Sequence, residues 1–250
     1  MRLFLLRLYP IALVLAVWEA STRLGLVDPF LLPSFTAVLK ALVANADTLA
    51  TDSFITLGRA AAGLAIGGSI GLATGMLMAR YRAVGDFFDP LVSAIFPTPK
   101  LALFPLLMVW LGLGEGSKIA LIALSAFFPI TVNTYAGIRG VDKFLIWNAQ
   151  TKGASSFQML TKVMLPAALP FIFTGLRVST AFSFLLAIAA EMLSANNGLG
   201  FRLIYSQRTF EPETMYASLL LVASLGFIVD RLLGILIRRM LAWQDTTEIT

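Results

Sequence analysis

Long apolar stretches, broken only by short polar segments, dominate this chain of 250 residues. Hydrophobic residues make up 58% of the sequence, charged residues make up 13%, and the mean hydropathy is +0.84. A soluble domain carries about 25% charged residues, so this composition indicates an integral membrane protein. Each crossing needs roughly 20 apolar residues, which leaves room for about six spans. Because backbone polar groups in lipid must be satisfied within the segment, we expect an all-α, polytopic membrane protein.

The expected spans differ in how clearly the sequence marks them. They cover residues 8–26, 55–79, 84–113, 119–138, 167–192 and 215–237. The first is the weakest, since Arg7 and Glu19 bracket a short apolar run. Residues 1–18 also resemble a signal peptide, but no small-residue cleavage site is evident and Glu19 follows directly. We therefore interpret this segment as a retained first helix.

Basic residues gather on one side of the predicted membrane. They are Arg2, Arg7, Arg80, Arg82, Arg139, Lys143, Lys152, Lys162, Arg231, Arg238 and Arg239. Cytosolic loops of membrane proteins carry an excess of Lys and Arg, so we expect this side to be cytosolic. Both termini and the polar loop after the fourth span then lie in the cytosol.

Several classes of chemistry lack the residues they need. The chain contains no cysteine and no histidine, which excludes disulfides and removes the commonest general base and metal ligand. A glycine-rich phosphate loop ending in Gly-Lys-Ser/Thr is also missing, so ATP hydrolysis would need another subunit. Two function classes stay open on residue types alone: an intramembrane hydrolase of the Ser–Lys kind, and a passive channel or scaffold subunit. The composition gives no indication of nucleic-acid binding.

The polar segment 142–166 lies between two apolar spans and has the pattern of two short helices joined by a turn. Asp142 can cap the first helix, and Gly153 suits a left-handed residue at its end. Ser155 and Gln158 form a plausible capping box for the second helix, which we expect to end near Pro166. Such a helix could lie in a groove on a partner. The alternative is an amphipathic helix that rests on the lipid surface.

This segment resembles the EAA loop of ATP-binding-cassette (ABC) importer permeases. That loop has the pattern Glu-Ala-Ala, three residues, Gly, nine residues, Ile, one residue, Leu-Pro. The residues at matching positions are Ala149, Gly153, Val163, Leu165 and Pro166. Trp147 and Asn148 stand where the pattern has Glu and the first Ala. The spacing is therefore intact, and the acidic lead residue is not.

Other segments extend the resemblance over about residues 31–243. Residues 97–142 and 165–193, with the NGLG of 197–200, resemble the subfamily that imports nitrate, taurine, aliphatic sulfonates and thiamine or riboflavin precursors. The resemblance implies a single permease domain over 1–250, with the type I ABC importer fold and alternating access in the inner membrane. It also implies a second copy of the chain, two ATPase subunits that hold ATP and Mg, and an extracytoplasmic solute-binding protein. The chain itself would bind no cofactor and would not be an enzyme.

The resemblance implies that one group of residues couples this chain to the ATPase. These are Trp147, Ala149, Lys152, Gly153, Ala154, Ser155, Leu165 and Pro166. The transported solute stays open. We expect a small anion, such as a sulfonate or nitrate, because Lys100 and Arg177 offer cationic partners inside the membrane. A neutral vitamin precursor of the thiamine pyrimidine or riboflavin type is the alternative.

The third span carries the strongest signal for a substrate pathway. Pro97 and Pro99 remove backbone donors just before Lys100, and a lysine near mid-membrane usually faces a water-filled interior. Lys100 could instead pair with an acidic residue of another span, such as Glu191. For Arg177 and Glu191, structural pairing and a place in the pathway are both open.

Four glycines recur at intervals of four residues in the second span. They are Gly63, Gly67, Gly71 and Gly75. Small residues at this spacing form a smooth ridge that lets membrane helices approach closely. The ridge predicts tight packing within one subunit, or a sliding surface between helices that rearrange during transport.

Overall fold

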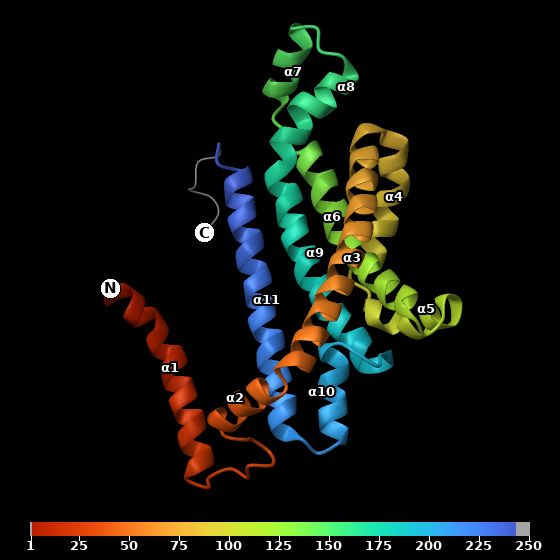
Figure 1. Cartoon of the computed structure of the whole chain (residues 1–250). Helices are drawn as coiled ribbons and strands as arrows, with labels where there is room; N and C mark the ends of the chain where they lie inside the picture. Colours follow the sequence, from red (N-terminus) through yellow and green to blue (C-terminus); the bar gives the residue numbers. More distant parts are fainter. Residues whose placement is uncertain (1, 244–250) are drawn as a thin grey trace. The chain divides into compact units, whose positions relative to one another are not determined.

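The computed structural model describes residues 2–243, with side chains from Tyr9 onward, and the described chain is helical (Figure 1). The elements are α1 (Arg2–Arg23), α2 (Phe35–Ala44), α3 (Ala46–Arg80), α4 (Arg82–Ile95), a 3-10 turn (Lys100–Leu103), α5 (Phe104–Leu111), α6 (Glu115–Arg139), α7 (Lys143–Thr151), α8 (Ser156–Met159), a π-helical turn (Leu160–Met164), α9 (Leu165–Ser194), α10 (Leu199–Arg208) and α11 (Pro212–Met240). The all-α expectation is confirmed. The two ends of the chain, Met1 and 244–250, lie outside the described residues, and with them the prediction that both termini are cytosolic.

The chain forms two compact units. The first comprises Met1–Thr56 and Glu191–Leu225, and the second comprises Leu57–Ala190 and Gly226–Thr250. In the first unit, Val38, Leu49 and Leu199 are fully or almost fully buried and form a small core. Trp18 packs on this core, and its indole nitrogen donates a hydrogen bond to the Pro33 carbonyl at 2.9 Å. In the second unit, the apolar cores lie between the long helices, around residues such as Ile122.

Four helices are long and apolar enough to cross a membrane. They are Ala46–Arg80, Glu115–Arg139, Ser156–Ser194 and Pro212–Met240, and they contain the predicted spans 55–79, 119–138, 167–192 and 215–237. A fifth crossing is present if the bent pair Arg82–Ile95 and Lys100–Leu111 counts as one span. The expectation of about six spans is therefore reduced to four or five for the described residues. The predicted first span, 8–26, falls in α1, which contains Pro10, ends at Arg23 and is not among these helices.

The predicted third span, 84–113, is not one continuous helix. Instead α4 and the segment Lys100–Leu111 are bent by 94°, as in a broken span or a re-entrant loop. The prolines explain the break, because Pro97 and Pro99 lack the backbone N–H that a continuing helix needs. Pro105 does not interrupt α5, since it stands at the first turn, where a missing donor is tolerated.

The glycine ridge of α3 lies against α6 within the second unit. A Cβ atom on Gly71 would come within 2.6 Å of the Phe127 carbonyl oxygen, and one on Gly75 within 2.7 Å of Thr134. A Cβ on Gly67 would collide with the backbone of Ala123. The two helices therefore touch backbone to backbone, and the close approach that the four-residue spacing predicts is present inside this subunit.

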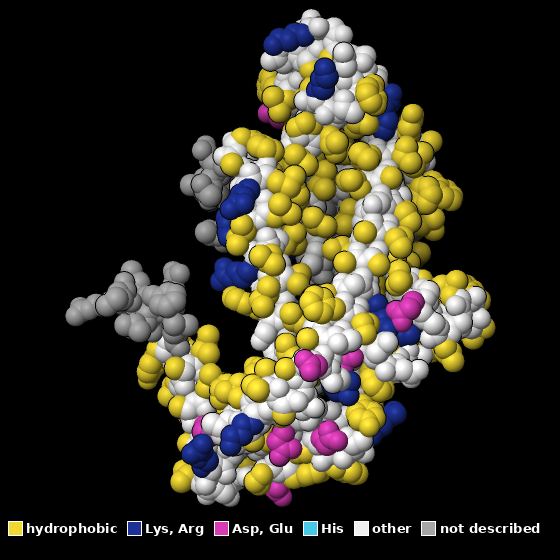
Figure 2. All heavy atoms as spheres, viewed as in Figure 1, with side chains coloured by type: hydrophobic (Ala, Val, Ile, Leu, Met, Phe, Trp, Pro, Cys, Tyr) yellow, Lys and Arg dark blue, Asp and Glu magenta, His cyan; other side chains and the backbone are white. Residues whose placement is uncertain are grey.

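The long helices carry many exposed hydrophobic side chains, as Figure 2 shows in yellow. In the second unit, Phe87 is 63% exposed, Leu185 58% and Phe227 61%. A soluble monomer rarely exposes large contiguous apolar patches, whereas lipid-facing helices must. The surface thus agrees with the membrane assignment that the composition gives.

Candidate functional site

A short helix, α7, follows the end of α6 and projects with α8 beyond the long helices of the second unit (Figure 1). Its N-cap is Asp142, whose carboxylate accepts a hydrogen bond from the Phe144 backbone N–H at 2.8 Å. The predicted cap is confirmed, and the helix ends at Thr151, two residues before Gly153. The chain thus turns out of α6 at Gly140 and immediately starts a new helix.

The turn between α7 and α8 also follows its local sequence. Gly153 has a φ of 76°, the left-handed conformation that favours glycine. The Ser155 side chain accepts from the Gln158 N–H at 3.3 Å, and the Gln158 side chain accepts from the Ser155 N–H at 2.9 Å. This reciprocal pair is the predicted capping box. Ala154 donates to the Ala149 carbonyl at 3.1 Å, which closes the turn.

The second short helix does not end near Pro166, contrary to the prediction. It continues through the π-helical turn Leu160–Met164 into α9, and Pro166 lies in the first turn of α9. Membrane helices tolerate proline where a local π-helical adjustment satisfies the freed carbonyl groups. The projecting segment is therefore joined by continuous helical backbone to the span that carries Arg177.

The outer surface of α7 and α8 exposes large apolar side chains. Phe144 is 73% exposed, Trp147 54% and Phe157 74%, and the rings of Phe144 and Trp147 meet edge to face at 5.6 Å. The other residues of the predicted coupling group also lie here or in the turns beside it. Lys152, Gly153, Ser155 and Pro166 are exposed, and Ala149, Ala154 and Leu165 are half-buried. The segment presents an apolar face on a capped, well-defined backbone.

Lys100 lies at the bend between α4 and α5. Its ammonium donates to the Phe96 carbonyl and sits 5.0 Å from the Phe96 ring centroid and 5.1 Å from that of Phe128. Aromatic faces attract cations in this position. Lys100 makes these contacts and does not form the ion pair with Glu191 that was the alternative expectation. Pro97 and Pro99 are exposed beside the bend.

Arg177 of α9 forms a two-pronged ion pair with Asp230 of α11. The Arg177 Nε and Nη2 atoms each lie 2.8 Å from a carboxylate oxygen of Asp230. The two side chains are 56% and 46% exposed, although both stand inside helices long enough to span the membrane. Phe184 and Gly226 line a shallow hollow next to the pair. Charges facing lipid are costly, so this face requires water or protein against it.

Glu191 is buried in the first unit, with 1% exposure. Its carboxylate accepts hydrogen bonds from the Thr56 hydroxyl at 2.9 Å and from the Gly200 N–H at 3.0 Å. Thr56 in turn accepts from the Leu199 N–H at 2.9 Å. Of the two roles left open for Glu191, this position supports structural pairing: it holds the start of α10 against α3 and α9.

Sequence reasoning missed two acidic residues that matter to these arrangements. Asp52 accepts from the Gly198 N–H and from Arg202 Nε, each at 2.8 Å, and completes the cluster around Glu191. Asp230 holds Arg177. A signal for Asp230 was present, since it is a lone acidic residue inside the apolar run 215–237. Asp52 gave none, because it precedes the predicted span and its partners are about 150 positions away.

The described part of the chain contains no group of three or more His, Cys, Asp or Glu side chains that could hold a metal ion. The polar clusters are instead closed by hydrogen bonds and ion pairs within the chain. Their chemistry is that of helix anchoring and of charge placement within spans.

Comparison with known proteins gives long matches along the chain. Residues 48–242 match the family described as binding-protein-dependent transport system inner membrane component. A putative aliphatic sulfonates transport permease of Bacillus subtilis is 34% identical over 95% of this chain and 87% of its own length. The taurine transport system permease of Escherichia coli is 33% identical over 95% and 89%. A putative ABC transporter permease of Methanocaldococcus jannaschii is 34% identical over 93% and 90%.

Solved structures show the same fold. A chain of the inward-facing methionine ABC transporter MetNI superposes with a TM-score of 0.66 at 20% identity, covering 77% of this chain and 96% of that one. A chain of an amino acid ABC transporter in a structure with histidines gives 0.65 at 18% identity, covering 79% and 96%. At such low identity these likenesses establish the fold alone, which is that of type I ABC importer permeases.

The extent of these matches decides the family, because the relatives align over nearly the whole chain and the family match includes both the projecting segment and the long spans. Such a subunit is not an enzyme and typically binds no cofactor; it works with a separate ATPase and a solute-binding protein. This chain belongs to the binding-protein-dependent transport system inner membrane components, as a multi-pass ABC importer permease of the inner membrane.

Proposed function

We propose that α7 and α8 form the coupling element, which docks in a groove of a partner ATPase in the cytosol. The observation that carries this proposal is the exposed apolar face of Phe144, Trp147 and Phe157 on helices that are capped at both starts. An amphipathic helix in a partner's groove is a common recognition mode. The helix Ser156–Ser194 runs without a break from that face into the membrane.

In this proposal, two copies of the chain form the pore and each receives one ATPase subunit. ATP and Mg bind to the ATPases, whose closure moves α7 and α8 and opens the pore toward a loaded solute-binding protein. Hydrolysis then returns the pore to its inward-facing state. The excess of Lys and Arg on one side of the predicted membrane supports a cytosolic position for α7, α8 and both chain termini.

We propose a small organic anion of the sulfonate class as the solute. Two observations support this class: the half-exposed Arg177–Asp230 pair inside the spans, and relatives named for aliphatic sulfonates and taurine. A sulfonate can compete with Asp230 for the two N–H groups of Arg177, because planar guanidinium groups bind oxyanions in a two-pronged manner. Lys100 offers a second cation. A neutral vitamin precursor is the competing solute.

An uptake assay on the purified transporter in vesicles tests this choice. We expect taurine or a short alkanesulfonate to be taken up with ATP, and we expect Arg177→Gln to reduce uptake at least tenfold while assembly is kept. Lys100→Met should also lower uptake and leave basal ATPase activity intact. Arg208→Gln, at the end of α10, is the matched control that removes one charge elsewhere. Uptake of a thiamine pyrimidine with no uptake of sulfonates would contradict the anion proposal.

A further inference from the structure

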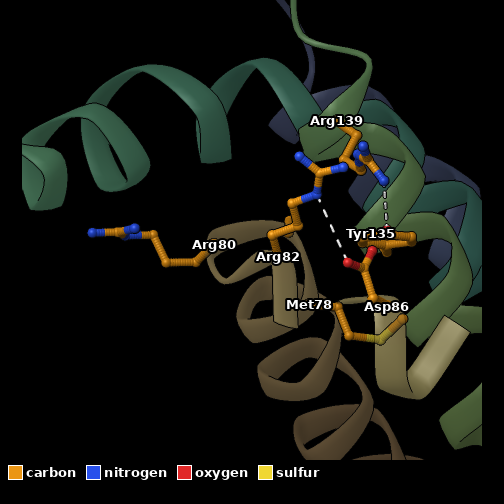
Figure 3. Close-up of a pocket in the computed structure, with 7 residues that line it drawn as sticks. Met78, Arg80, Arg82, Asp86, Tyr135 and Arg139 are labelled. Carbon is orange, nitrogen blue, oxygen red and sulfur yellow. Dashed lines mark hydrogen bonds and ion pairs between the residues drawn. The ribbon is translucent and has the colours of Figure 1, made fainter. Parts of the chain in front are cut away.

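A basic hollow lies where α3 ends, α4 begins and α6 ends, in the second unit (Figure 3). It encloses about 350 Å³. Arg80, Arg82 and Arg139 line it, together with Tyr135 and a single acidic residue, Asp86. In Figure 3, Arg82 and Arg139 point toward each other above Asp86 and Tyr135, whereas Arg80 points away.

The positive charges of this hollow are only partly compensated. Arg82 Nε lies 3.7 Å from the Asp86 carboxylate, and the two side chains are 95% and 69% exposed. An ion pair this exposed has little interaction energy, so it neutralises Arg82 only weakly. Arg139 donates one hydrogen bond to the Tyr135 hydroxyl, at 2.7 Å. Each guanidinium has several further donors that point in a fixed fork. Two convergent guanidinium groups with donors to spare form a receptor for an oxyanion, which would also relieve their mutual repulsion.

The position of the hollow relative to the membrane indicates which oxyanion it would meet. α3 ends at Arg80 and α6 ends at Arg139, and both helices are long enough to cross the membrane. The 25 residues of α6 have about the length of one bilayer crossing, so its end at Arg139 lies near the level of the lipid headgroups. Tyr81 and Phe87 each neighbour a lining residue in the sequence and are 51% and 63% exposed, which provides apolar surface for acyl chains near the hollow. Basic pockets between membrane helices are known receptors for phosphate-bearing headgroups.

We propose that this hollow binds the phosphate group of an anionic phospholipid, held between Arg82 and Arg139. The site lies close in sequence to the coupling element, because Asp142, the N-cap of α7, follows Arg139 by three residues. A bound headgroup would brace the end of α6 where the chain turns into α7. The lipid site stands independently of the proposed solute, since none of its residues belongs to the predicted pathway.

Lipid retention by the intact transporter tests this proposal directly. The purified complex, with its ATPase subunits, is titrated in detergent with phosphatidylglycerol and bound lipids are counted by native mass spectrometry. The double variant Arg82→Gln/Arg139→Gln should weaken phosphatidylglycerol binding about 30-fold, equal to about 2 kcal/mol for two basic side chains. Arg238→Gln/Arg239→Gln is the matched control, since it removes two exposed arginines from the end of α11. Arg82→Lys/Arg139→Lys keeps the charge and should retain most of the binding.

The remaining arms separate the possible sources of the oxyanion. Phosphatidylcholine should bind much more weakly than phosphatidylglycerol, and millimolar inorganic phosphate should not displace the lipid. Equal lipid retention by the Gln variant and its control would overturn the proposal. Displacement by inorganic phosphate would identify a site for the free ion instead. Loss of the ATPase subunits from the Gln variant, with lipid retention unchanged, would make the hollow a protein contact. None of these readouts uses uptake, so they are independent of the proposed transport function.

Discussion

Two short helical elements link spans in this chain, and they are anchored in opposite ways. The start of α10 is held by residues distant from it in sequence. The backbone N–H groups of residues 198, 199 and 200 donate hydrogen bonds to Asp52, Thr56 and Glu191, respectively. The starts of α7 and α8 are held by their own neighbours, Asp142 and the pair Ser155 and Gln158. The first anchor is buried, and the second is exposed.

This difference separates an element that is built into the scaffold from one that, in our proposal, docks on a partner. Buried carboxylates with several hydrogen bonds fix α10 within its own unit, since any movement would leave polar groups unpaired. Local caps define the shape of α7 and α8 but leave the outer face of Phe144, Trp147 and Phe157 uncovered. We therefore expect changes at the α10 anchor to reduce stability, and changes on α7 and α8 to reduce coupling.

The largest effect is expected at Asp52, which is 3% exposed. Asp52→Ala leaves the Gly198 N–H and the Arg202 guanidinium without their acceptor, and removing one partner of a buried ion pair costs about 3–5 kcal/mol. Thermal unfolding of the purified permease measures this loss. Asp47→Ala is the control, because Asp47 is exposed near the start of the same helix. Equal stability of the two variants would show that the anchor is not structural.

Two glycines with left-handed backbone conformations sharpen the comparison. Gly198 has a φ of 99° and a Cβ there would come within 2.5 Å of the Glu191 carboxylate, whereas Gly153 has a φ of 76° and open space around it. Gly153→Ala should therefore cost only the backbone strain of about 1–2 kcal/mol. Gly198→Ala should destabilise the permease more, because the anchor must also shift. Melting curves of the two variants compare them, and the reverse order would contradict the account.

The smallest effect on stability is expected on the outer face of α7 and α8. Trp147→Ser/Phe157→Ser removes exposed side chains, so the melting temperature of the isolated permease should change little, within about 0.5 kcal/mol. Binding of the ATPase should fall strongly, since buried aromatic side chains dominate interface energies. Co-purification of the ATPase measures this. Trp243→Ser, which alters another exposed tryptophan, should co-purify normally. Full ATPase binding by the double variant would place the docking surface elsewhere.

The same contrast explains what could be predicted from the sequence. The cap at Asp142, the turn at Gly153 and the box at Ser155 are local patterns, and each is confirmed because its partners lie within a few residues. The α10 anchor joins positions about 140 apart, and no local pattern marks it. The prediction of a continuous span 84–113 was wrong because it gave the hydrophobicity of the segment more weight than Pro97 and Pro99, which break the helix. The prediction that the helix ends near Pro166 was wrong, because a π-helical turn before Pro166 satisfies the carbonyl groups that the missing proline N–H leaves free.

The most direct test of the account is where a cysteine at position 152 reacts. The native chain has no cysteine, so Lys152→Cys introduces a single thiol in the exposed turn after α7. We expect this thiol to crosslink to the ATPase subunit with a yield that ATP changes. Membrane-impermeant reagents outside intact cells should not reach it. Arg208 lies at the end of α10, between the last two predicted spans, so the predicted topology puts it outside and Arg208→Cys should be labelled there. Labelling of the cysteine at position 152 from outside, without an ATPase crosslink, would contradict the account.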